Sequence, residues 1–174
     1  LVVLATYKTD TYEKEQKRET SQLNATTYGE HIKNDITDGI EITNALEQVL
    51  ISENGKFNQF DTIAKNLMSD SIESVQLAPD GVVTDIYPIS GNEAGKIDLL
   101  HDKDRGEISC YARDNHTVIT QGPFELKQGD YGIAVRNPVY LNDENGQEYF
   151  WGFTIVILRV PEIFSDSISA LSNF

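Results

Sequence analysis

The residue types that most often carry out catalysis or hold a metal are scattered along this sequence. It has one cysteine, Cys110, and three histidines, which are His31, His101 and His116. None of the histidines falls in an H-x-x-x-H or H-E-x-x-H pattern, and no cysteine–histidine cluster has the spacing of a zinc site. Asp102 and Asp104 beside His101 fit the polar first turn of a helix better than a metal or acid–base site. The sequence contains neither a G-x-S-x-G nucleophile elbow nor a phosphate-binding loop. We therefore expect no catalytic residues, no metal and no cofactor.

A second group of side chains, in the middle of the chain, suits the binding of a small molecule. Its hydrogen-bonding members are Tyr87, Ser90, Asn92, Glu93, Asp98 and Thr120. Its apolar members, which could form the walls of a pocket, are Leu99, Phe124, Ile133 and Val135. A few polar groups among apolar walls are typical of sites for small polar or amphipathic molecules. Asp98 has a second interpretation, as the N-cap of a helix.

The composition indicates a soluble globular domain and excludes several classes of partner. The 174 residues include 28 acidic and 14 basic ones, which gives a net charge of −14. The basic residues form no cluster, so we expect no binding to nucleic acid or to an anionic membrane surface. No apolar run reaches the ~18 residues needed to cross a bilayer. The short apolar stretch 1–5 fits either the end of a transmembrane helix or an ordinary helix start.

Residues 6–50 are predicted to form one long helix, because they contain no proline. The first part is polar on nearly all sides, which favours projection into solvent or pairing with another helix. The later part has apolar residues at spacings of three and four, namely Ile32, Ile36, Ile40, Leu46, Val49 and Leu50. Asn54-Gly55 should end this helix. A second helix, capped by Asn58, follows with the apolar stripe Phe60, Ile63, Ala64, Leu67 and Met68.

After Ser71 the apolar period changes to two, which predicts strands. Residues 73–77 should form a hairpin, through the turn 79–81, with a strand that has Val82, Thr84 and Ile86 on one face. A short helix capped near Asp102 should carry Ile108, Tyr111 and Ala112. The remaining predicted elements are strands 117–126 (bent at Gly122-Pro123), 131–141 and 149–160, and a last helix from Pro161. This order predicts an α+β fold with one five-stranded antiparallel sheet, helices on one face, and a pocket between the sheet and the helical crossover.

Between Leu77 and Phe153 the chain also carries an ordered set of short motifs. They are Leu-Ala-Pro-Asp-Gly-Val-Val at 77–83, Ile-Tyr-Pro at 86–88, Gly-Asn-Glu-Ala at 91–94, Asp-Leu-Leu at 98–100, Arg105, Ala-Arg at 112–113, Gly-Pro-Phe-Glu-Leu at 122–126, Gln-Gly at 128–129, Pro-Val-Tyr at 138–140 and Phe-Trp-Gly-Phe at 150–153. Together these motifs resemble the CHASE family, a sensor module outside the cytoplasm that occurs in plant cytokinin receptors and in many bacterial receptors. The helical first 70 residues look like the membrane-proximal stalk and return helix of that family.

The resemblance implies a PAS-like sensor fold held between two transmembrane helices, with an output domain in the cytoplasm such as a histidine kinase, diguanylate cyclase or adenylyl cyclase. It implies three parts, which are a helical stalk and return helix at 1–70, a PAS-like sensor domain at 71–160, and a C-terminal helix at 161–174. That last helix would lead toward a membrane-proximal subdomain, which we expect to be missing from this chain.

The resemblance also suggests where a ligand would bind. In the plant receptors a carboxylate on a pocket strand, a backbone group near the crossover and a threonine hold the ligand. The strand matches residues 86–92, the crossover group matches Asp98-Leu99-Leu100, and the threonine matches Thr120. Here Ile89 and Ser90 stand at the carboxylate position, so cytokinin is not the expected ligand.

We thus predict a ligand-binding sensor domain on the extracytoplasmic side of a membrane, which is not itself an enzyme and forms a homodimer through its polar N-terminal helix. One alternative is a soluble solute-binding or protein-interaction module without a membrane tether, which a full gene lacking flanking hydrophobic spans would favour. A hydrolase with a dispersed site is another, which a screen of ester, phosphate and glycoside substrates would reveal.

Overall fold

A computed structural model describes residues 2–89, 97–126 and 129–161 of the chain. Its first element is the helix α1, Val2–Ser52. The helix ends where predicted, because Asn54 and Gly55 take left-handed backbone angles, with φ of 52° and 80°. The backbone N–H of Gly55 donates to the carbonyl of Leu50 at 2.7 Å and so closes the last turn.

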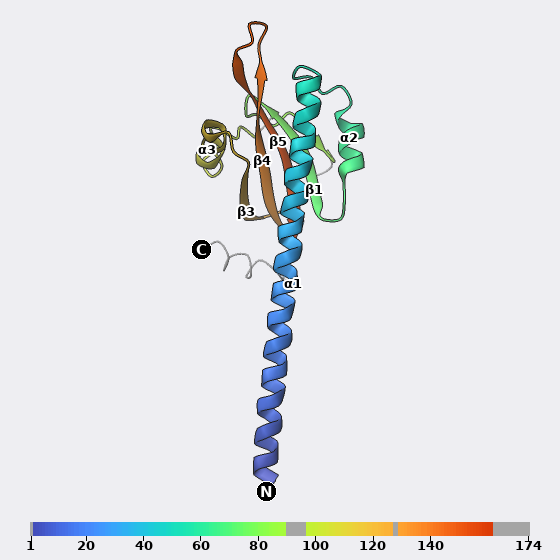
Figure 1. Cartoon of the computed structure of the whole chain (residues 1–174), viewed down its shortest axis with the longest axis vertical. Coiled ribbons are helices and arrows are strands. Elements are labelled where there is room, and N and C mark those ends of the chain that lie inside the picture. The colour runs from blue at the N-terminus through green and yellow to red at the C-terminus, as the bar shows by residue number, and fades with distance from the viewer. Residues whose placement is uncertain (1, 90–96, 127–128, 162–174) are drawn as a thin grey trace.

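The two halves of α1 have different surroundings. The N-terminal half extends away from the rest of the domain, and the C-terminal half lies along the sheet (Figure 1). Leu46, Leu50 and Thr43 in the second half are fully buried. Residues 12–24 are exposed to solvent. The predicted change from a polar to a one-sided apolar helix is therefore confirmed.

Helix α2, Phe60–Leu67, buries Phe60 and Ala64 as its stripe predicts. The predicted cap is wrong: the N-cap position is Gln59, and its side chain makes no capping hydrogen bond. Asn58 instead donates from its backbone N–H and from Nδ2 to Oε2 of Glu53, at 3.2 and 3.0 Å. The side chain of Asn58, which was expected to cap α2, is therefore bonded to Glu53, the residue that follows α1.

Five strands form a single sheet in the spatial order β2-β1-β5-β4-β3, and every neighbouring pair is antiparallel. Their bounds are Ile72–Pro79 for β1, Asp85–Tyr87 for β2, Ile119–Glu125 for β3, Tyr131–Asn142 for β4 and Glu148–Val160 for β5. The α+β class and the five-stranded antiparallel sheet are confirmed. The register of β3 shifts between Gln121 and Phe124, at the predicted bend.

Strand β2 is shorter than predicted, and the face expected for it is wrong. Val83 and Ile86 are buried, whereas Thr84 is exposed. After the turn at Asp80 and Gly81 the chain bonds to residues 97–99 as well as to β1. The N–H of Val83 donates to Ile97 and the N–H of Leu99 donates to Gly81. This second pairing interrupts the simple alternation on which the prediction depended.

The sheet is covered on both faces, which corrects the expectation of helices on one face. Helices α1 and α2 pack on one face, here called the helix face, over a cluster that includes Val75, Val135 and Val156. The described part of the crossover (residues 97–115) packs on the other, the crossover face, over Ile155 and Phe153. A sheet buried on both faces needs apolar residues in consecutive positions, as in β4 and β5.

Helix α3, Gly106–Asn115, belongs to the crossover and contacts β3 and β4. Its buried side is formed by Gly106, Ser109 and Ala112. Tyr111, expected on that side, is exposed. The N-cap position is Arg105, which makes no side-chain capping hydrogen bond. Asp102 instead stabilises the turn before the helix, since its Oδ1 accepts the backbone N–H groups of Asp104 and Arg105 at 2.9 Å each.

Candidate ligand-binding site

The crossover face combines an apolar lining with two buried polar side chains. The apolar residues are Ala78, Val83, Ile86, Leu99, Ala112, Ile119, Phe153 and Ile155. Arg136 of β4 lies among them, because its cross-strand partners are Ile119 on β3 and Ile155 on β5. Residues that are paired across strands point to the same face of a sheet. The guanidinium of Arg136 therefore lies between the sheet and the crossover.

Arg136 is almost completely buried, with 3% of its surface exposed. Its Nη1 donates to Oε1 of Gln121 at 2.6 Å, and Nε2 of Gln121 donates to the carbonyl of Asp104 at 2.9 Å. Within the described residues, Nε of Arg136 has no hydrogen-bond partner. Burial, and next the charge of Arg105, lower the pKa of Arg136 to about 10, against the opposing effect of Asp102. The group therefore stays protonated at neutral pH.

Ser109 is the second polar side chain of this kind. It is 0% exposed, and its Oγ has no hydrogen-bond partner among the residues that the structure describes. It lies one turn before Ala112 on the side of α3 that packs toward the sheet. Buried hydroxyl and guanidinium groups nearly always have partners in folded proteins, so each of these two groups can bond to a further partner, either an ordered water or a polar ligand.

The predicted site residues lie on both faces of the sheet. Leu99 is buried in the cluster on the crossover face, and Leu100 packs beside it. Phe124 lies on the same face, where its ring approaches Gly132. Tyr87 and Ile133, in contrast, pack in the cluster under α1 and α2 on the helix face.

Thr120 is exposed and is paired with Val135, which places it on the helix face. The backbone of the sheet therefore separates Thr120, Tyr87 and Ile133 from Leu99, Leu100 and Phe124. Ile89 is 71% exposed. Ser90, Asn92 and Glu93 lie outside the described residues. Their assignment to a ligand site stays a prediction, as does a cavity beneath the crossover.

Asp98 has local partners that account for its carboxylate. Its Oδ1 accepts the backbone N–H groups of Leu100 and His101, at 3.1 and 3.2 Å, and its Oδ2 lies 2.8 Å from Nδ1 of His101. The side-chain hydrogen bond to His101 is the main reason that the pKa of Asp98 is lowered. The carboxylate of Asp98 thus accepts backbone N–H groups as a helix cap would, but it stabilises a turn and not a helix.

Sequence reasoning missed Arg136, Ser109 and Gln121. One signal for Arg136 was present in the sequence: Arg136-Asn137 interrupts an otherwise apolar run in the predicted strand 131–141. A charged residue in such a strand is seldom buried without a function or a partner. Ser109 carries no comparable signal, since a serine in a short helix usually faces solvent.

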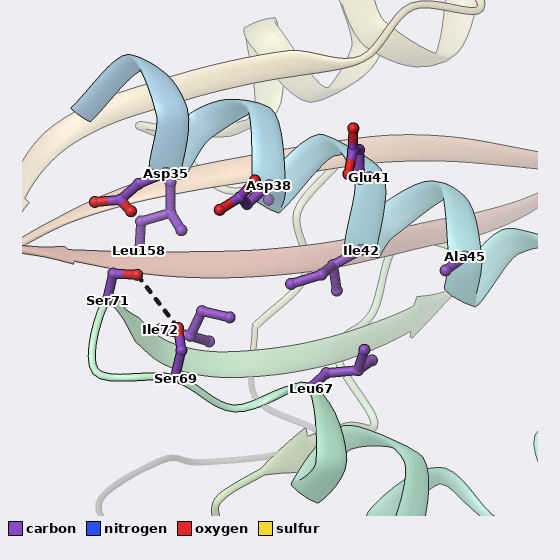
Figure 2. Close-up of a pocket in the computed structure, with 11 residues that line it drawn as sticks. Asp35, Asp38, Glu41, Ile42, Ala45, Leu67, Ser69, Ser71, Ile72 and Leu158 are labelled. Carbon is purple, nitrogen blue, oxygen red and sulfur yellow. Dashed lines mark hydrogen bonds between the residues drawn. The ribbon is translucent and has the colours of Figure 1, made fainter. Parts of the chain in front are cut away.

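A groove lies on the opposite side of the sheet, between α1 and the start of β1. Its volume is about 500 Å³, and Asp35, Asp38 and Glu41 of α1 lie along its rim (Figure 2). Its apolar lining includes Leu67 and Leu158. Three carboxylates at the rim disfavour an anionic ligand there. None of the predicted site residues lines this groove.

Two further properties concern only the described part of the chain. No three His, Cys, Asp or Glu side chains in it are grouped so that they could hold a metal ion. No helix in those ranges is both long enough and apolar enough to cross a membrane.

Comparisons with known proteins agree with this architecture. The family model named CHASE domain matches residues 69–173. Among solved structures, an extracellular ligand binding receptor from Desulfohalobium retbaense DSM5692 has a TM-score of 0.59 and 16% sequence identity. That match covers 83% of this chain and 26% of the receptor chain, so the present chain spans about a quarter of the length of that protein. At this identity the likeness is one of fold. No curated protein sequence matches the chain.

The family match includes the whole sheet and the crossover, and it agrees with the family that the motifs between Leu77 and Phe153 indicate. CHASE domains are sensory modules and not catalytic ones. Because the matched region is more than half of the 174 residues, this chain belongs to the CHASE domain family and is a sensor domain.

Proposed function

We propose that this domain is the extracytoplasmic, ligand-binding part of a transmembrane receptor of the histidine kinase or diguanylate cyclase type. It binds a small molecule between the crossover and the sheet, and the membrane helices transmit the signal inward. The observation that carries the proposal is a pair of buried polar groups on the crossover face that have no hydrogen-bond partner among the described residues, Nε of Arg136 and Oγ of Ser109. Membership of the CHASE family and a fold shared with an extracellular ligand binding receptor support it.

Strand β4 offers a route from this site to the stalk. Arg136 faces the crossover, and the next residue, Asn137, faces α1. The side-chain amide of Asn137 donates to Oε2 of Glu47 at 2.9 Å and to Oδ1 of Asn44 at 3.2 Å. A ligand that binds one arrangement of β4 and α1 more tightly than another would shift the receptor toward it. The size of that shift is limited by the difference in affinity.

The exposed half of α1 is the proposed dimerisation element. Tyr12 and Leu23 are 65% and 68% exposed. They are eleven positions apart, which is close to three turns, so they lie on the same side of the helix. Sedimentation equilibrium at high protein concentration should detect a dimer that deletion of residues 1–27 abolishes. Leu23→Glu should weaken it, whereas Ser21→Glu, on the opposite side of the helix, should not. A monomer at every concentration contradicts this part of the proposal.

Ligand binding is tested by a thermal-shift screen of small metabolites. A true ligand at 100 times its dissociation constant should stabilise the domain by about 2.7 kcal/mol. Hydrogen exchange then locates the site: amides of residues 99–116 and of the middle of β4 should be protected, and those of residues 12–24 should not. Protection confined to the groove under Asp35 and Asp38 contradicts the proposed position.

Hydrophobic spans on both sides of this segment in the full-length gene would support the membrane tether.

A further inference from the structure

The position of Arg136 allows an inference about the chemistry of the ligand. The side chain is 3% exposed and is surrounded by apolar neighbours on β3 and β5, Ile119 and Ile155. A buried guanidinium is normally paired with a carboxylate, because removing a charge from water is costly unless an opposite charge or several hydrogen bonds replace the water. Here the hydrogen-bond partner given by the described residues is the neutral amide oxygen of Gln121.

The nearby carboxylate is already engaged. Oδ2 of Asp102 lies 3.2 Å from Nη1 of Arg105, and its Oδ1 accepts two backbone N–H groups. Arg105 adds a second positive charge close enough to disfavour the charge on Arg136. Within the described residues Arg136 therefore forms no ion pair with a carboxylate.

The geometry of a guanidinium narrows the class of anion. Nε and the adjacent amino group form a planar fork whose two N–H groups match the two oxygens of a carboxylate. In Arg136 the Nη1 group is bonded to Gln121 and the Nε group has no partner among the described residues. Ser109, across from the sheet on α3, adds a hydroxyl that can donate to a polar part of the same ligand or accept from it.

We propose that the ligand of this sensor domain is a small carboxylate, whose carboxyl group binds the guanidinium of Arg136. This inference rests on the proposed function, because it names the chemical class that the same site takes. The competing interpretation is purely structural: Arg136 and Gln121 would link β4 and β3 to the carbonyl of Asp104, and the ligand would be neutral.

The experiment uses matched pairs of compounds on the full 174-residue chain. Small mono- and dicarboxylates and α-amino acids are each tested beside their primary amides, with phosphate monoesters and neutral alcohols as separate groups. Thermal shift identifies compounds that bind, and calorimetric titration measures their affinity. The variants are Arg136→Met, which removes the charge at similar volume, and Arg136→Lys, which keeps the charge but loses the fork. Arg18→Met, on the exposed part of α1, is the control.

A carboxylate should bind the unaltered chain, and its amide should bind at least about 30-fold more weakly, as expected when one partner of a buried charge pair is lost. Arg136→Met should cause a loss of the same size, Arg136→Lys a loss of about tenfold, and Arg18→Met none. If Arg136→Met does not fold, Arg136→Lys decides, and an unchanged affinity overturns the proposal.

Other outcomes separate this inference from the proposed function. Binding of neutral compounds alone, or of phosphate monoesters alone, overturns the carboxylate while a ligand-binding domain remains. Carboxylate binding that survives Arg136→Met overturns the role of Arg136. If no compound of any group binds, both the inference and the proposed function fail.

Discussion

Asn137 on β4 and Glu47 on α1 are joined by a hydrogen bond of 2.9 Å between Nδ2 and Oε2, although 90 residues separate them in the chain. Asn137 is 5% exposed, and it directly follows Arg136, which points to the other face of the sheet. The middle of β4 thus contacts the stalk helix with one side chain and the candidate ligand site with the next. A displacement of this strand would act on both.

Asn137→Leu should destabilise the domain, because it removes both hydrogen bonds to α1 and leaves the carboxylate of Glu47 without that partner. We expect the free energy of unfolding to fall by about 1–3 kcal/mol. Urea denaturation measures this change. Gln48→Leu, on the exposed side of α1, is the control and should have little effect. Equal midpoints for Asn137→Leu and the unaltered protein would show that these bonds contribute nothing.

Thr154→Val tests a second anchor of α1. The hydroxyl of Thr154 on β5 donates to the backbone carbonyl of Thr43 at 2.9 Å, and both residues are fully buried. Valine has nearly the same shape but cannot donate, so the carbonyl loses a partner. Stability should fall by about 1 kcal/mol. Thr84→Val, at an exposed position, serves as the control in the same thermal unfolding experiment, and an equal effect of the two would refute the assignment.

Arg136→Met should leave the ligand-free domain at least as stable as before. Folding lowers the pKa of Arg136 to about 10, which corresponds to a penalty of roughly 3 kcal/mol for the charged form. Removing the charge therefore raises the free energy of unfolding. The loss of the hydrogen bond to Gln121 lowers it by about 1 kcal/mol, which is smaller than that gain. The sign follows from the direction of the shift. Below pH 10 the group is protonated in both states and the penalty is complete, and it is relieved only as the pH rises above about 10 toward the higher pKa of the unfolded chain. Urea denaturation at pH 7 that gives a clear loss of stability would contradict this reasoning.

Gly152→Ala should be severely destabilising. Gly152 has φ of 149°, and a Cβ atom there would collide with the carbonyl oxygen of Ala78 on β1. Because that oxygen belongs to the backbone of the paired strand, it cannot move aside without disturbing the sheet, and we expect a loss of about 4 kcal/mol or more. Gly146→Ala is the matched control. Gly146 has φ of 79° in a turn, and no atom lies near the position of the new Cβ. Thermal unfolding should therefore show a loss of stability of only about 1 kcal/mol.

Asp98 should make stability depend on acid pH. Its folded-state pKa is lowered from 3.8, mainly by the hydrogen bond to His101. A carboxyl group whose pKa is lower in the folded state contributes stability above its unfolded pKa, and that contribution is lost as the pH falls below about 3.8. Asp98→Asn should therefore lower the melting temperature more at pH 5 than at pH 3. Asp38→Asn corrects for the general effect of removing one negative charge, and equal differences at both pH values would contradict the role of Asp98.

The amino-acid pattern by itself determined most of the local structure. The long helix, its end at Asn54-Gly55 and the three C-terminal strands follow from periodicity and turn residues, because these signals act between neighbours in the chain. The motifs between Leu77 and Phe153 were sufficient to indicate the CHASE family. The cap of α2 and the length of β2 were not predictable in this way, since Glu53 and residues 97–99 offer partners that periodicity does not report.

Only the tertiary structure decided which residues share a surface. Alternation says that Thr120 and Gln121 point to opposite faces, but it does not say which face the crossover covers. That depends on the packing of α1, α2 and α3 on a sheet whose adjacent strands come from distant parts of the chain. For this reason Thr120, Tyr87 and Ile133 lie apart from Leu99 and Phe124. The burial of Arg136 likewise follows from elements that pack on it from elsewhere in the sequence, so its partners and its charge environment exist only in the folded chain.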